Sequence, residues 1–311
     1  MKLSTRHILS INDLTKKDVQ LILQTADSFK EISERPIKKV PTLRGRTVIN
    51  CFFEDSTRTR LSFELAEKRL SADSANISKS GSAMAKKGET LLDTIRNLEA
   101  MRPDILIIRH NVAGSPAQAA EVTRAHVINA GDGLHEHPTQ ALLDLMSIKN
   151  AKGRISGLKV GIVGDILHSR VARSNLLLFK KMGIEAFVGG PPTLIPTGVE
   201  EIYGAKVCYD IREVLPELDV LMVLRIQRER MEQHYFPSLR EYARHFGVSN
   251  DMLRAAKDDL IVMHPGPVNR GVEISAHVAD GPRSIILDQV TNGVAVRMAL
   301  LYLLIGEGEN N

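Results

Sequence analysis

The sequence predicts an α/β protein that carries parallel sheets in two domains. Short apolar segments rich in β-branched residues alternate along the whole chain with segments of helical pattern, and this alternation favours the α/β class. The apolar segments are continuous instead of alternating with polar residues, as expected for parallel strands covered on both faces. The chain of 311 residues is long enough for about two domains of ordinary size.

The apolar segments define the expected strands. We expect buried strands at 47–53, 104–108, 159–163, 220–224 and 260–263. Thr15, followed three residues later by Asp18, resembles a capping box and predicts a helix that runs from there to about residue 30. Further helices are expected at about 58–70, 89–101, 139–150 and 287–305.

The break between the two domains is expected near residues 151–154, where a helical pattern ends before a new series that begins with a strand. The last helix, at about 287–305, is strongly apolar. Its periodicity does not decide which of the two domains it joins.

Composition and charge exclude several classes of function. The chain is 43% apolar and 25% charged, as ordinary globular proteins are. Its net charge is +4, and no run of five like charges occurs, so we expect neither a nucleic acid nor a membrane as partner. We expect a cytoplasmic protein, because no apolar leader is visible and the longest apolar stretch, 298–305, is too short to cross a bilayer.

Motifs for metals and cofactors are not found. Cys51 and Cys208 lie far apart and belong to no Cys/His cluster. His135, Glu136 and His137 lack the spacing of a zinc helix motif. The glycines at 161 and 164 form GxxG, whereas dinucleotide binding requires GxGxxG. We therefore expect neither a metal nor a cofactor.

The richest polar segment is 53–60, which follows an expected strand and opens an expected helix. It brings together the hydroxyls of Ser56, Thr57 and Thr59 with the guanidinium of Arg58. Free N–H groups at a helix start bind anions, phosphate above all, and arginine adds charge-assisted hydrogen bonds. We therefore predict a phosphate site at the carboxyl end of this strand. The alternative is an ordinary helix cap with solvated arginines.

Other expected strands also end in polar groups. Arg109 and His110 follow the strand at 104–108, and a turn-rich loop with His137 precedes the helix at 139–150. In the second half, polar groups at 168–170, 225–230 and 264–271 come after the expected strands at 159–163, 220–224 and 260–263. These groups can position and neutralise anions, and no nucleophile is evident. The pattern favours a transfer reaction driven by proximity and electrostatic stabilisation.

Taken in order, these motifs resemble those of the aspartate/ornithine carbamoyltransferase family. They are the Phe-Glu-Asp-Ser-Thr-Arg-Thr-Arg segment at 53–60, Lys87-Gly88-Glu89, Arg109-His110, His137-Pro138-Thr139-Gln140 and His264-Pro265-Gly266-Pro267. The resemblance covers essentially the whole chain. Arg225-x-Gln227 and the run at 264–271 resemble the aspartate-specific members, whereas the ornithine-specific members share a His-Cys-Leu-Pro segment.

The resemblance implies two Rossmann-like domains with parallel sheets, linked by helices. The first domain, 1–150, would hold carbamoyl phosphate, and the C-terminal helix at about 290–311 would cross back to it. The second domain, 151–289, would hold aspartate. The implied reaction joins carbamoyl phosphate and L-aspartate to give N-carbamoyl-L-aspartate and phosphate, a step of de novo pyrimidine synthesis.

The resemblance also implies a role for each matched residue. The phosphate would be held by Ser56, Thr57, Arg58 and Thr59. Arg109 would bridge the phosphate and the carbonyl oxygen, which His137 would polarise together with Thr59. The carbamoyl NH₂ would be held by Gln140 and the carbonyls of Pro265 and Gly266, with Pro267 in the same site.

The carboxylates of aspartate would be bound by Arg170, Arg225, Gln227 and Lys87. Closure of the two domains would pair Glu54 with Arg170 and Arg230. The family works as a homotrimer with shared active sites, and Lys87 would arrive from the adjacent subunit. Family trimers stand alone or join regulatory or dihydroorotase-type chains.

One position departs from the family pattern. Some members carry a phosphate-binding serine four residues before the lysine, and here that position is Ala83, with Ser82 one residue earlier. Three other functions stay open from the sequence alone: transfer to ornithine or another amine, a nucleotide- or nucleic-acid-binding α/β module, and a catalytically silent scaffold subunit.

Overall fold

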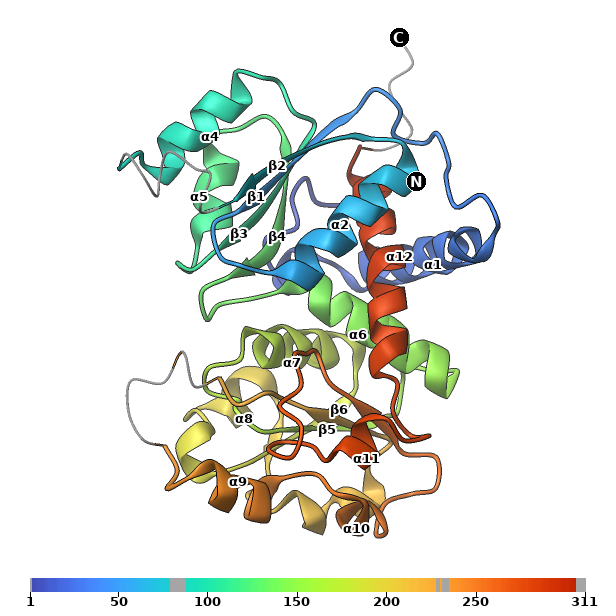
Figure 1. Ribbon diagram of the computed structural model, residues 1–311, viewed down its shortest axis with the longest axis vertical. Coiled ribbons are helices and arrows are strands. Elements are labelled where there is room, and N and C mark those ends of the chain that lie inside the picture. Colours follow the sequence, from blue (N-terminus) through green and yellow to red (C-terminus); the bar gives the residue numbers. More distant parts are fainter. Residues whose placement is uncertain (1, 79–87, 228–229, 231–234, 306–311) are drawn as a thin grey trace. The chain divides into compact units, whose positions relative to one another are not determined.

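The computed structural model describes residues 2–78, 88–227, 230 and 235–305 (Figure 1). The chain divides into two compact units, and each unit contains one sheet of parallel strands. The first unit consists of Met1–Leu143 together with Thr291–Asn311, and the second consists of Asp144–Val290. The expected fold class, α/β with two parallel sheets, is confirmed.

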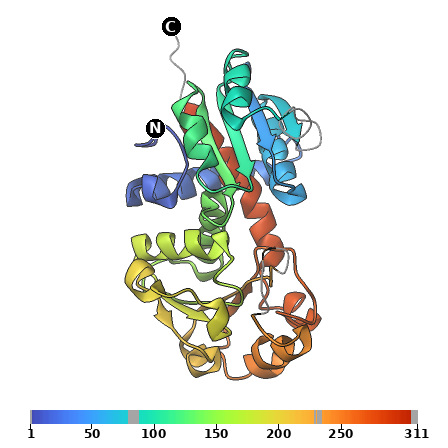
Figure 2. The same ribbon diagram turned by 90° about the vertical axis from the view of Figure 1, so that its left-hand side faces the viewer.

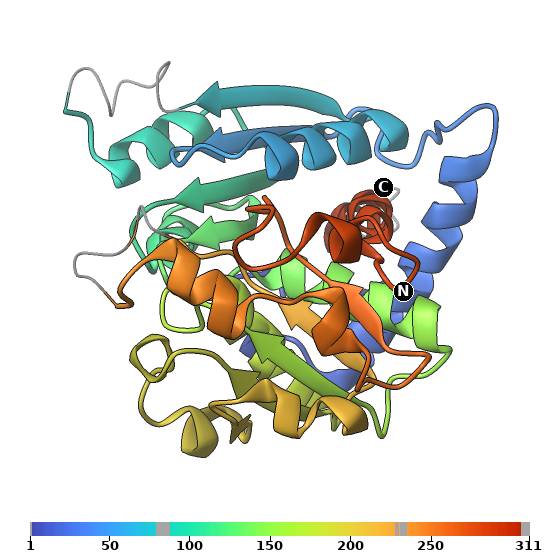
Figure 3. The ribbon, with the colours of Figure 1, turned by 60° about the horizontal axis from the view of Figure 1, so that its bottom comes forward.

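The sheet of the first unit has four strands in the order β2-β1-β3-β4. Their bounds are β1 (Thr47–Phe52), β2 (Asp73–Ser78), β3 (Ile105–His110) and β4 (His126–Asp132). All neighbours are parallel, and their arrows point the same way in Figure 3. Phe52 pairs with Arg109 where the central strands β1 and β3 end, so side chains that follow these two strands meet at one edge of the sheet.

Helices pack around this sheet. They are α1 (Lys16–Glu34), α2 (Thr57–Leu70), α4 (Leu91–Glu99), α5 (Ser115–Glu121), the first turns of α6 (Pro138–Lys152) and the part of α12 (Ile286–Ile305) that begins at Thr291. The capping box predicted for Thr15 and Asp18 is present at the start of α1. The rings of Phe29 on α1 and Tyr302 on α12 lie 5.7 Å apart, and Figure 2 shows the end of α12, in red, among the elements of the first unit. The C-terminal helix therefore returns to the first unit, as expected.

The sheet of the second unit has five strands in the order β7-β6-β5-β8-β9, again all parallel. Their bounds are β5 (Lys159–Val163), β6 (Glu185–Gly189), β7 (Lys206–Val207), β8 (Val220–Val223) and β9 (Ile261–Met263). From β5, the chain adds β6 and then β7 on one side of this strand, and it adds β8 and then β9 on the other side. Such a reversal of strand order leaves a crevice at the carboxyl ends of the strands, where α/β sheets bind ligands.

The helices of the second unit include α7 (Arg170–Met182), α8 (Val199–Tyr203), α9 (Leu239–Phe246), α10 (Asn250–Leu253) and α11 (Ala276–Ala279). Short 3₁₀ turns occur at Ile11–Asp13 in the first unit and at Pro192–Leu194, Ile211–Glu213 and Leu215–Glu217 in the second. Among the described residues, no helix is both long enough and apolar enough to cross a membrane.

The five expected strands are all present, with ends that differ by at most two residues from the predicted ranges. β2, β4, β6 and β7 were not predicted from the sequence. β2 lies at the edge of its sheet, and its residues from Asp73 to Asn76 are exposed. An edge strand in that setting does not need the apolar run by which the other strands were recognised.

Candidate active site

The N-terminus of α2 is the first feature of the candidate site. β1 ends at Phe52, and Ser56 directly precedes the first helical residue, Thr57. Within the described residues the Ser56 hydroxyl makes no capping hydrogen bond, whereas Thr90 caps α4 by accepting from the N–H of Asp93. The positive end of the α2 dipole is therefore not covered by a side-chain cap, which makes it suitable for an anion.

The four residues predicted to bind phosphate lie together on this first turn. The Thr59 side chain is buried, Ser56 is half-buried, and Thr57 and Arg58 are exposed. Ser56, Thr57 and Arg58 are thus accessible to solvent at the N-terminal turn of the helix. This arrangement favours the predicted phosphate site over an ordinary cap, since an ordinary serine cap would use its hydroxyl on the helix itself.

Arg109 lies beside this turn, at the carboxyl end of β3. Its backbone carbonyl accepts from the N–H of Phe53 at 2.9 Å, which joins β3 to the loop that leads into α2. The Arg109 Nη2 donates to Oε1 of Glu54 at 2.7 Å, and its Nη1 donates to the carbonyl of Ala130 at 3.2 Å. The guanidinium is therefore held in the site by a carboxylate and a backbone carbonyl.

The loop between β4 and α6 places His137 and Gln140. The His137 side chain is buried, with its Nδ1 3.5 Å from Oγ1 of Thr139. Gln140 is half-buried on the first turn of α6. Glu136, also buried, accepts at Oε2 from the N–H of Ile11 at 3.1 Å, so the loop is anchored to the N-terminal segment.

Asp132 is a buried carboxylate that the sequence analysis did not single out. It accepts from the N–H of Gly114 at 2.7 Å, from Nδ1 of His135 at 3.0 Å and from Nδ2 of Asn129 at 2.9 Å. Burial raises the pKa of Asp132, but these hydrogen bonds outweigh burial and hold the pKa below its ordinary value. Asp132 thereby ties together the loops that follow β3 and β4.

His110, at the end of β3, belongs to the same network. Its Nδ1 accepts from the N–H of Val112 at 2.9 Å, and its ring meets that of Phe53 edge to face at 5.7 Å. Burial lowers the pKa of His110 below the ordinary value, although Glu54 and Asp132 act in the opposite direction. A neutral ring in this position supports the strand end without adding charge.

In the second unit, Asp165 is the centre of a hydrogen-bond network after β5. Its Oδ1 accepts from the N–H of His168 at 3.1 Å and from Nδ1 of His168 at 2.8 Å, and its Oδ2 accepts from the N–H of Gln227 at 3.2 Å. The His168 carbonyl in turn accepts from Nε2 of Gln227 at 3.0 Å and from Nη1 of Arg230 at 3.2 Å. The loops after β5 and β8 are therefore locked to each other.

The arginines predicted to bind aspartate surround this network. Arg170 is the first residue of α7, directly after the N-cap Ser169, and its side chain is buried. Arg225 follows β8 and is half-buried, as is Arg230. The structure thus brings Arg170, Arg225, Gln227 and Arg230 to the carboxyl ends of β5 and β8, at the reversal of strand order. Carboxylates match such guanidinium groups in shape and charge.

The segment from His264 to Pro267 follows β9 at the same end of the sheet. His264 is buried, and its backbone N–H donates to Oε1 of Gln289 at 2.9 Å. Pro265 and Gly266 are half-buried and Pro267 is exposed. Gly266 has φ +67°, a conformation that favours glycine.

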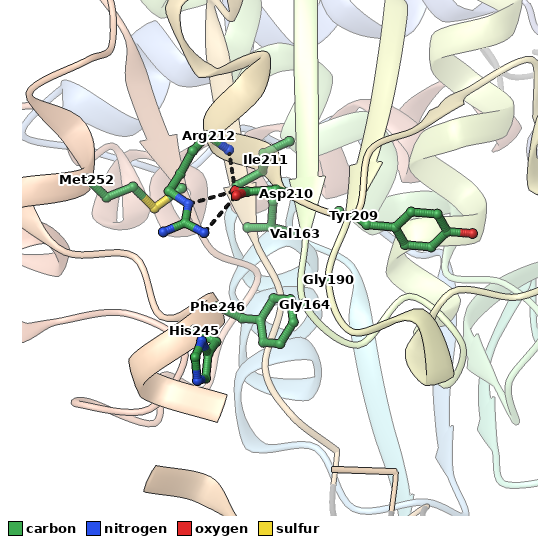
Figure 4. Close-up of a pocket in the computed structure, with 11 residues that line it drawn as sticks. Val163, Gly164, Gly190, Tyr209, Asp210, Ile211, Arg212, His245, Phe246 and Met252 are labelled. Carbon is green, nitrogen blue, oxygen red and sulfur yellow. Dashed lines mark hydrogen bonds and ion pairs between the residues drawn. The ribbon is translucent and has the colours of Figure 1, made fainter. Parts of the chain in front are cut away.

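A separate cavity of about 220 Å³ lies in the second unit, beside the ends of β5 and β6 (Figure 4). Ile211, Phe246 and Met252 contribute its apolar side chains. Its rim carries Asp210 and Arg212, which are bound to each other through Nε at 2.7 Å and Nη2 at 2.6 Å. Of the predicted site residues that the structure describes, none lines this cavity.

Lys87, predicted to reach the ligands from a neighbouring subunit, lies outside the described residues, as do Ser82 and Ala83. The described residues contain no group of three or more histidine, cysteine, aspartate or glutamate side chains that could hold a metal ion. The strand ends carry arginine guanidinium groups, hydroxyl groups and a helix N-terminus, together with the carboxylates of Glu54, Asp132 and Asp165. Such a set of groups suits group transfer between anionic substrates.

Comparison with known proteins identifies the family. Residues 6–150 match the aspartate/ornithine carbamoyltransferase carbamoyl-P binding domain, and residues 156–304 match the Asp/Orn binding domain of the same enzymes. The chain is 59% identical over 306 residues to the aspartate carbamoyltransferase catalytic subunit of Syntrophus aciditrophicus (strain SB), covering 98% of this chain and 99% of that protein. The chain therefore belongs to the aspartate/ornithine carbamoyltransferase family.

Other relatives and solved structures are similar to this chain over almost its whole length. The aspartate carbamoyltransferase catalytic subunit of Desulfosudis oleivorans is 57% identical over 306 residues, covering 98% of each chain. Aspartate transcarbamoylase from Trypanosoma cruzi, solved with carbamoyl phosphate and aspartate, superposes with a TM-score of 0.86 at 31% identity and 96% coverage of each chain. The catalytic subunit of the M. Jannaschii enzyme gives a TM-score of 0.86 at 34% identity, covering 99% of this chain and 100% of that one.

Proposed function

We propose that this chain transfers the carbamoyl group of carbamoyl phosphate to the amine of L-aspartate, with release of phosphate, as a step of de novo pyrimidine synthesis. One observation carries the proposal most directly. Arg109 lies beside an α2 N-terminus that bears Ser56, Thr57 and Arg58 and no side-chain cap among the described residues. The solved relative that contains carbamoyl phosphate and aspartate supports the same pair of substrates.

The first unit binds carbamoyl phosphate in this proposal. The phosphate is held by Ser56, Thr57, Arg58 and Thr59 at the start of α2. Arg109 bridges the phosphate and the carbonyl oxygen, and His137 polarises that carbonyl together with Thr59. Positive charge and donors at these places stabilise the oxyanion as it forms and the phosphate as it leaves. Gln140 holds the carbamoyl NH₂, with Pro265, Gly266 and Pro267 of the second unit.

The second unit binds aspartate. Its carboxylates are bound by Arg170, Arg225 and Gln227 at the ends of β5 and β8, where the Asp165 network holds Gln227. The amine attacks the carbonyl directly, so no protein nucleophile is required. The leaving phosphate accepts the amine proton. Glu54 and Arg230 take part in domain closure, which excludes water from the reactants.

The assembly is part of the proposal. The active form is a cytoplasmic homotrimer in which Lys87 enters the site of the adjacent subunit and binds aspartate there. Closed symmetry makes each such interface equivalent. The relatives are named catalytic subunits, which is consistent with further association with regulatory or dihydroorotase-type chains. The reaction needs no metal or cofactor.

Phosphate release from carbamoyl phosphate tests the activity and its specificity together. The assay compares L-aspartate, L-ornithine and no amine under the same conditions. We expect release with L-aspartate alone. Release with ornithine would keep the family and reject the assignment of Arg170, Arg225 and Gln227 to a dicarboxylate substrate. Absence of release with either amine would reject the activity for the isolated chain.

Subunit exchange tests the shared site. In the proposal, a trimer made only of Arg58→Ala chains is inactive, and so is a trimer made only of Lys87→Ala chains. In a mixed trimer, some interfaces combine an intact Arg58 turn from one chain with an intact Lys87 from its neighbour. Mixing the two variants should therefore restore part of the activity. If exchange is verified by mass and no activity returns, Lys87 does not act across an interface.

A further inference from the structure

Two buried side chains of the second unit have no role in the function proposed so far. His264 follows β9, and Glu273 lies nine residues further along the chain. Both side chains are completely buried, and Nε2 of His264 lies 3.2 Å from Oε1 of Glu273. The same carboxylate oxygen accepts from the N–H of Asn269 at 2.5 Å. Burying a carboxylate costs free energy unless it is paired and hydrogen-bonded, as Glu273 is here.

The hydrogen bonds determine which nitrogen of His264 carries the proton. The N–H of Gly266 donates to Nδ1 of His264 at 2.8 Å, so Nδ1 must present its lone pair. The ring proton then resides on Nε2, which faces the Glu273 carboxylate. Without an acceptor at Nε2, the alternative tautomer would place a proton on Nδ1 against the Gly266 N–H, and two donors would oppose each other.

The Gly266 N–H belongs to the same peptide unit as the carbonyl of Pro265. In a planar trans peptide the N–H and the C=O point in opposite directions. A hydrogen bond that holds the Gly266 N–H on His264 therefore turns the Pro265 carbonyl away from the buried ring. Pro265 is one of the two residues whose carbonyls bind the carbamoyl NH₂ in the proposed function.

The surrounding backbone keeps both side chains in place. The Glu273 carbonyl accepts from the N–H of Val248 at 2.9 Å. The backbone N–H of His264 donates to Gln289, whose Nε2 donates in turn to Oδ1 of Asp144 at 2.8 Å. Neither partner of the pair can shift without breaking a buried hydrogen bond, so the ring orientation is determined from both ends.

We propose that Glu273 is a positioning residue for the carbamoyl group: through the Nε2–H tautomer of His264 it fixes the Gly266 N–H and thereby aims the Pro265 carbonyl at the carbamoyl NH₂. This inference rests on the proposed function. Glu273 does not touch the substrate. Its effect passes through one imidazole ring and one peptide plane.

Two substitutions at Glu273 separate positioning from packing. Glu273→Gln keeps an oxygen that can accept from Nε2–H, whereas Glu273→Leu fills the space and removes the acceptor. We expect Glu273→Leu to raise the KM for carbamoyl phosphate about tenfold with little change in kcat, the signature of a lost binding contact. Glu273→Gln should stay within about threefold of the parent. The affinity for inorganic phosphate, which the first unit binds, should be the same in both variants.

A second pair of variants tests the ring itself and covers the case in which Glu273→Leu does not fold. His264→Asn keeps an acceptor near the position of Nδ1, whereas His264→Gln reaches the position of Nε2 and leaves the Gly266 N–H without one. We expect the KM for carbamoyl phosphate to rise about tenfold in His264→Gln and clearly less in His264→Asn. Arg270→Ala, which breaks the exposed Arg270–Asp280 ion pair of the same segment, serves as the control for local disruption.

The outcomes are distinct. The parent protein must first transfer carbamoyl to aspartate. If it does not, the proposed function is rejected, and the positioning role of Glu273 is not. If the parent is active and the Leu and Gln substitutions at Glu273 raise the KM for carbamoyl phosphate equally, or neither raises it, the positioning role of Glu273 is rejected. A parallel loss of inorganic phosphate affinity would show a structural role only and would also overturn it. A ¹⁵N spectrum that shows a protonated Nδ1 in His264 of the parent would reject the tautomer directly.

Discussion

The carboxylate of Glu54 lies 2.7 Å from the guanidinium of Arg109, and both side chains are largely buried. Glu54 was predicted to pair with arginines of the second domain on closure, yet in this structure its carboxylate is bound within the first unit. Arg109 is also the arginine proposed to bridge the substrate. An incoming phosphate must therefore compete with Glu54 for the same guanidinium.

Replacement of Glu54 tests this competition. Glu54→Gln removes the negative charge with little change in size. The Arg109 guanidinium can then exchange its contact with residue 54 for an anion at a lower cost in free energy. We expect inorganic phosphate to bind about three- to tenfold more tightly, measured by calorimetry. The matched control is Glu64→Gln, which removes the carboxylate that pairs with Arg60 at 3.5 Å on the same helix. Unchanged or weaker phosphate binding in Glu54→Gln would contradict the competition.

Glu67 leads to a prediction about pH and stability. This carboxyl is fully buried on α2, and burial raises its pKa from 4.5 to about 7, although hydrogen bonds from Ser74 and Asn50 act in the opposite direction. The folded state therefore favours the protonated form. The free energy of unfolding should fall as pH rises from about 4.5 to about 7, by about 3 kcal/mol from this group.

Glu67→Gln is the corresponding test. The amide does not titrate, so this part of the pH dependence should disappear in thermal unfolding followed between pH 5 and 8. The Gln amide can also donate to Oδ1 of Asn50, which has no hydrogen-bond partner among the described residues. We expect the variant to match the parent near pH 5 and to be more stable at pH 8. Equal slopes for both proteins would show that Glu67 does not titrate in this range.

Asp165 should control aspartate binding without touching aspartate. Asp165→Asn places an amide where the carboxylate accepts from His168 and Gln227, so one donor would face another. We expect the KM for aspartate to rise about tenfold and the KM for carbamoyl phosphate to change less than about twofold. Asp210→Asn, on the separate cavity of the same unit, should leave both constants near those of the parent. Equal effects on both substrates would argue against a local role.

The predictability of the fold differs among elements for physical reasons. β5 was predicted at 159–163 and lies at Lys159–Val163, because its last four residues are apolar and buried and three of them are β-branched. β7 has two residues and β2 is exposed at the sheet edge, so neither strand needs the continuous apolar run by which the other strands were predicted. These strands depend on a neighbouring strand, and local sequence does not record that dependence.

The candidate site shows the same division. Ser56, Thr57, Arg58 and Arg109 could be predicted because hydroxyl and guanidinium groups directly after apolar strands are typical of anion sites. The buried carboxylates Asp132, Asp165 and Glu273 were missed. Their partners include residues distant in sequence; Asp165 binds Gln227, 62 residues away. A lone Asp or Glu in a loop is common, and only the folded chain reveals which ones are buried.

The composition of the first unit, which includes both ends of the chain, has a consequence for synthesis. The side chains of Val296, Leu300 and Leu304 on α12 are buried, and the segment from Thr291 belongs to the first unit. Domains usually form in the order in which they leave the ribosome. Here the first unit lacks a part of its core until α12 has been synthesised, whereas Asp144–Val290 is continuous. The folding of the first unit is therefore completed only after the whole of the second unit has been synthesised.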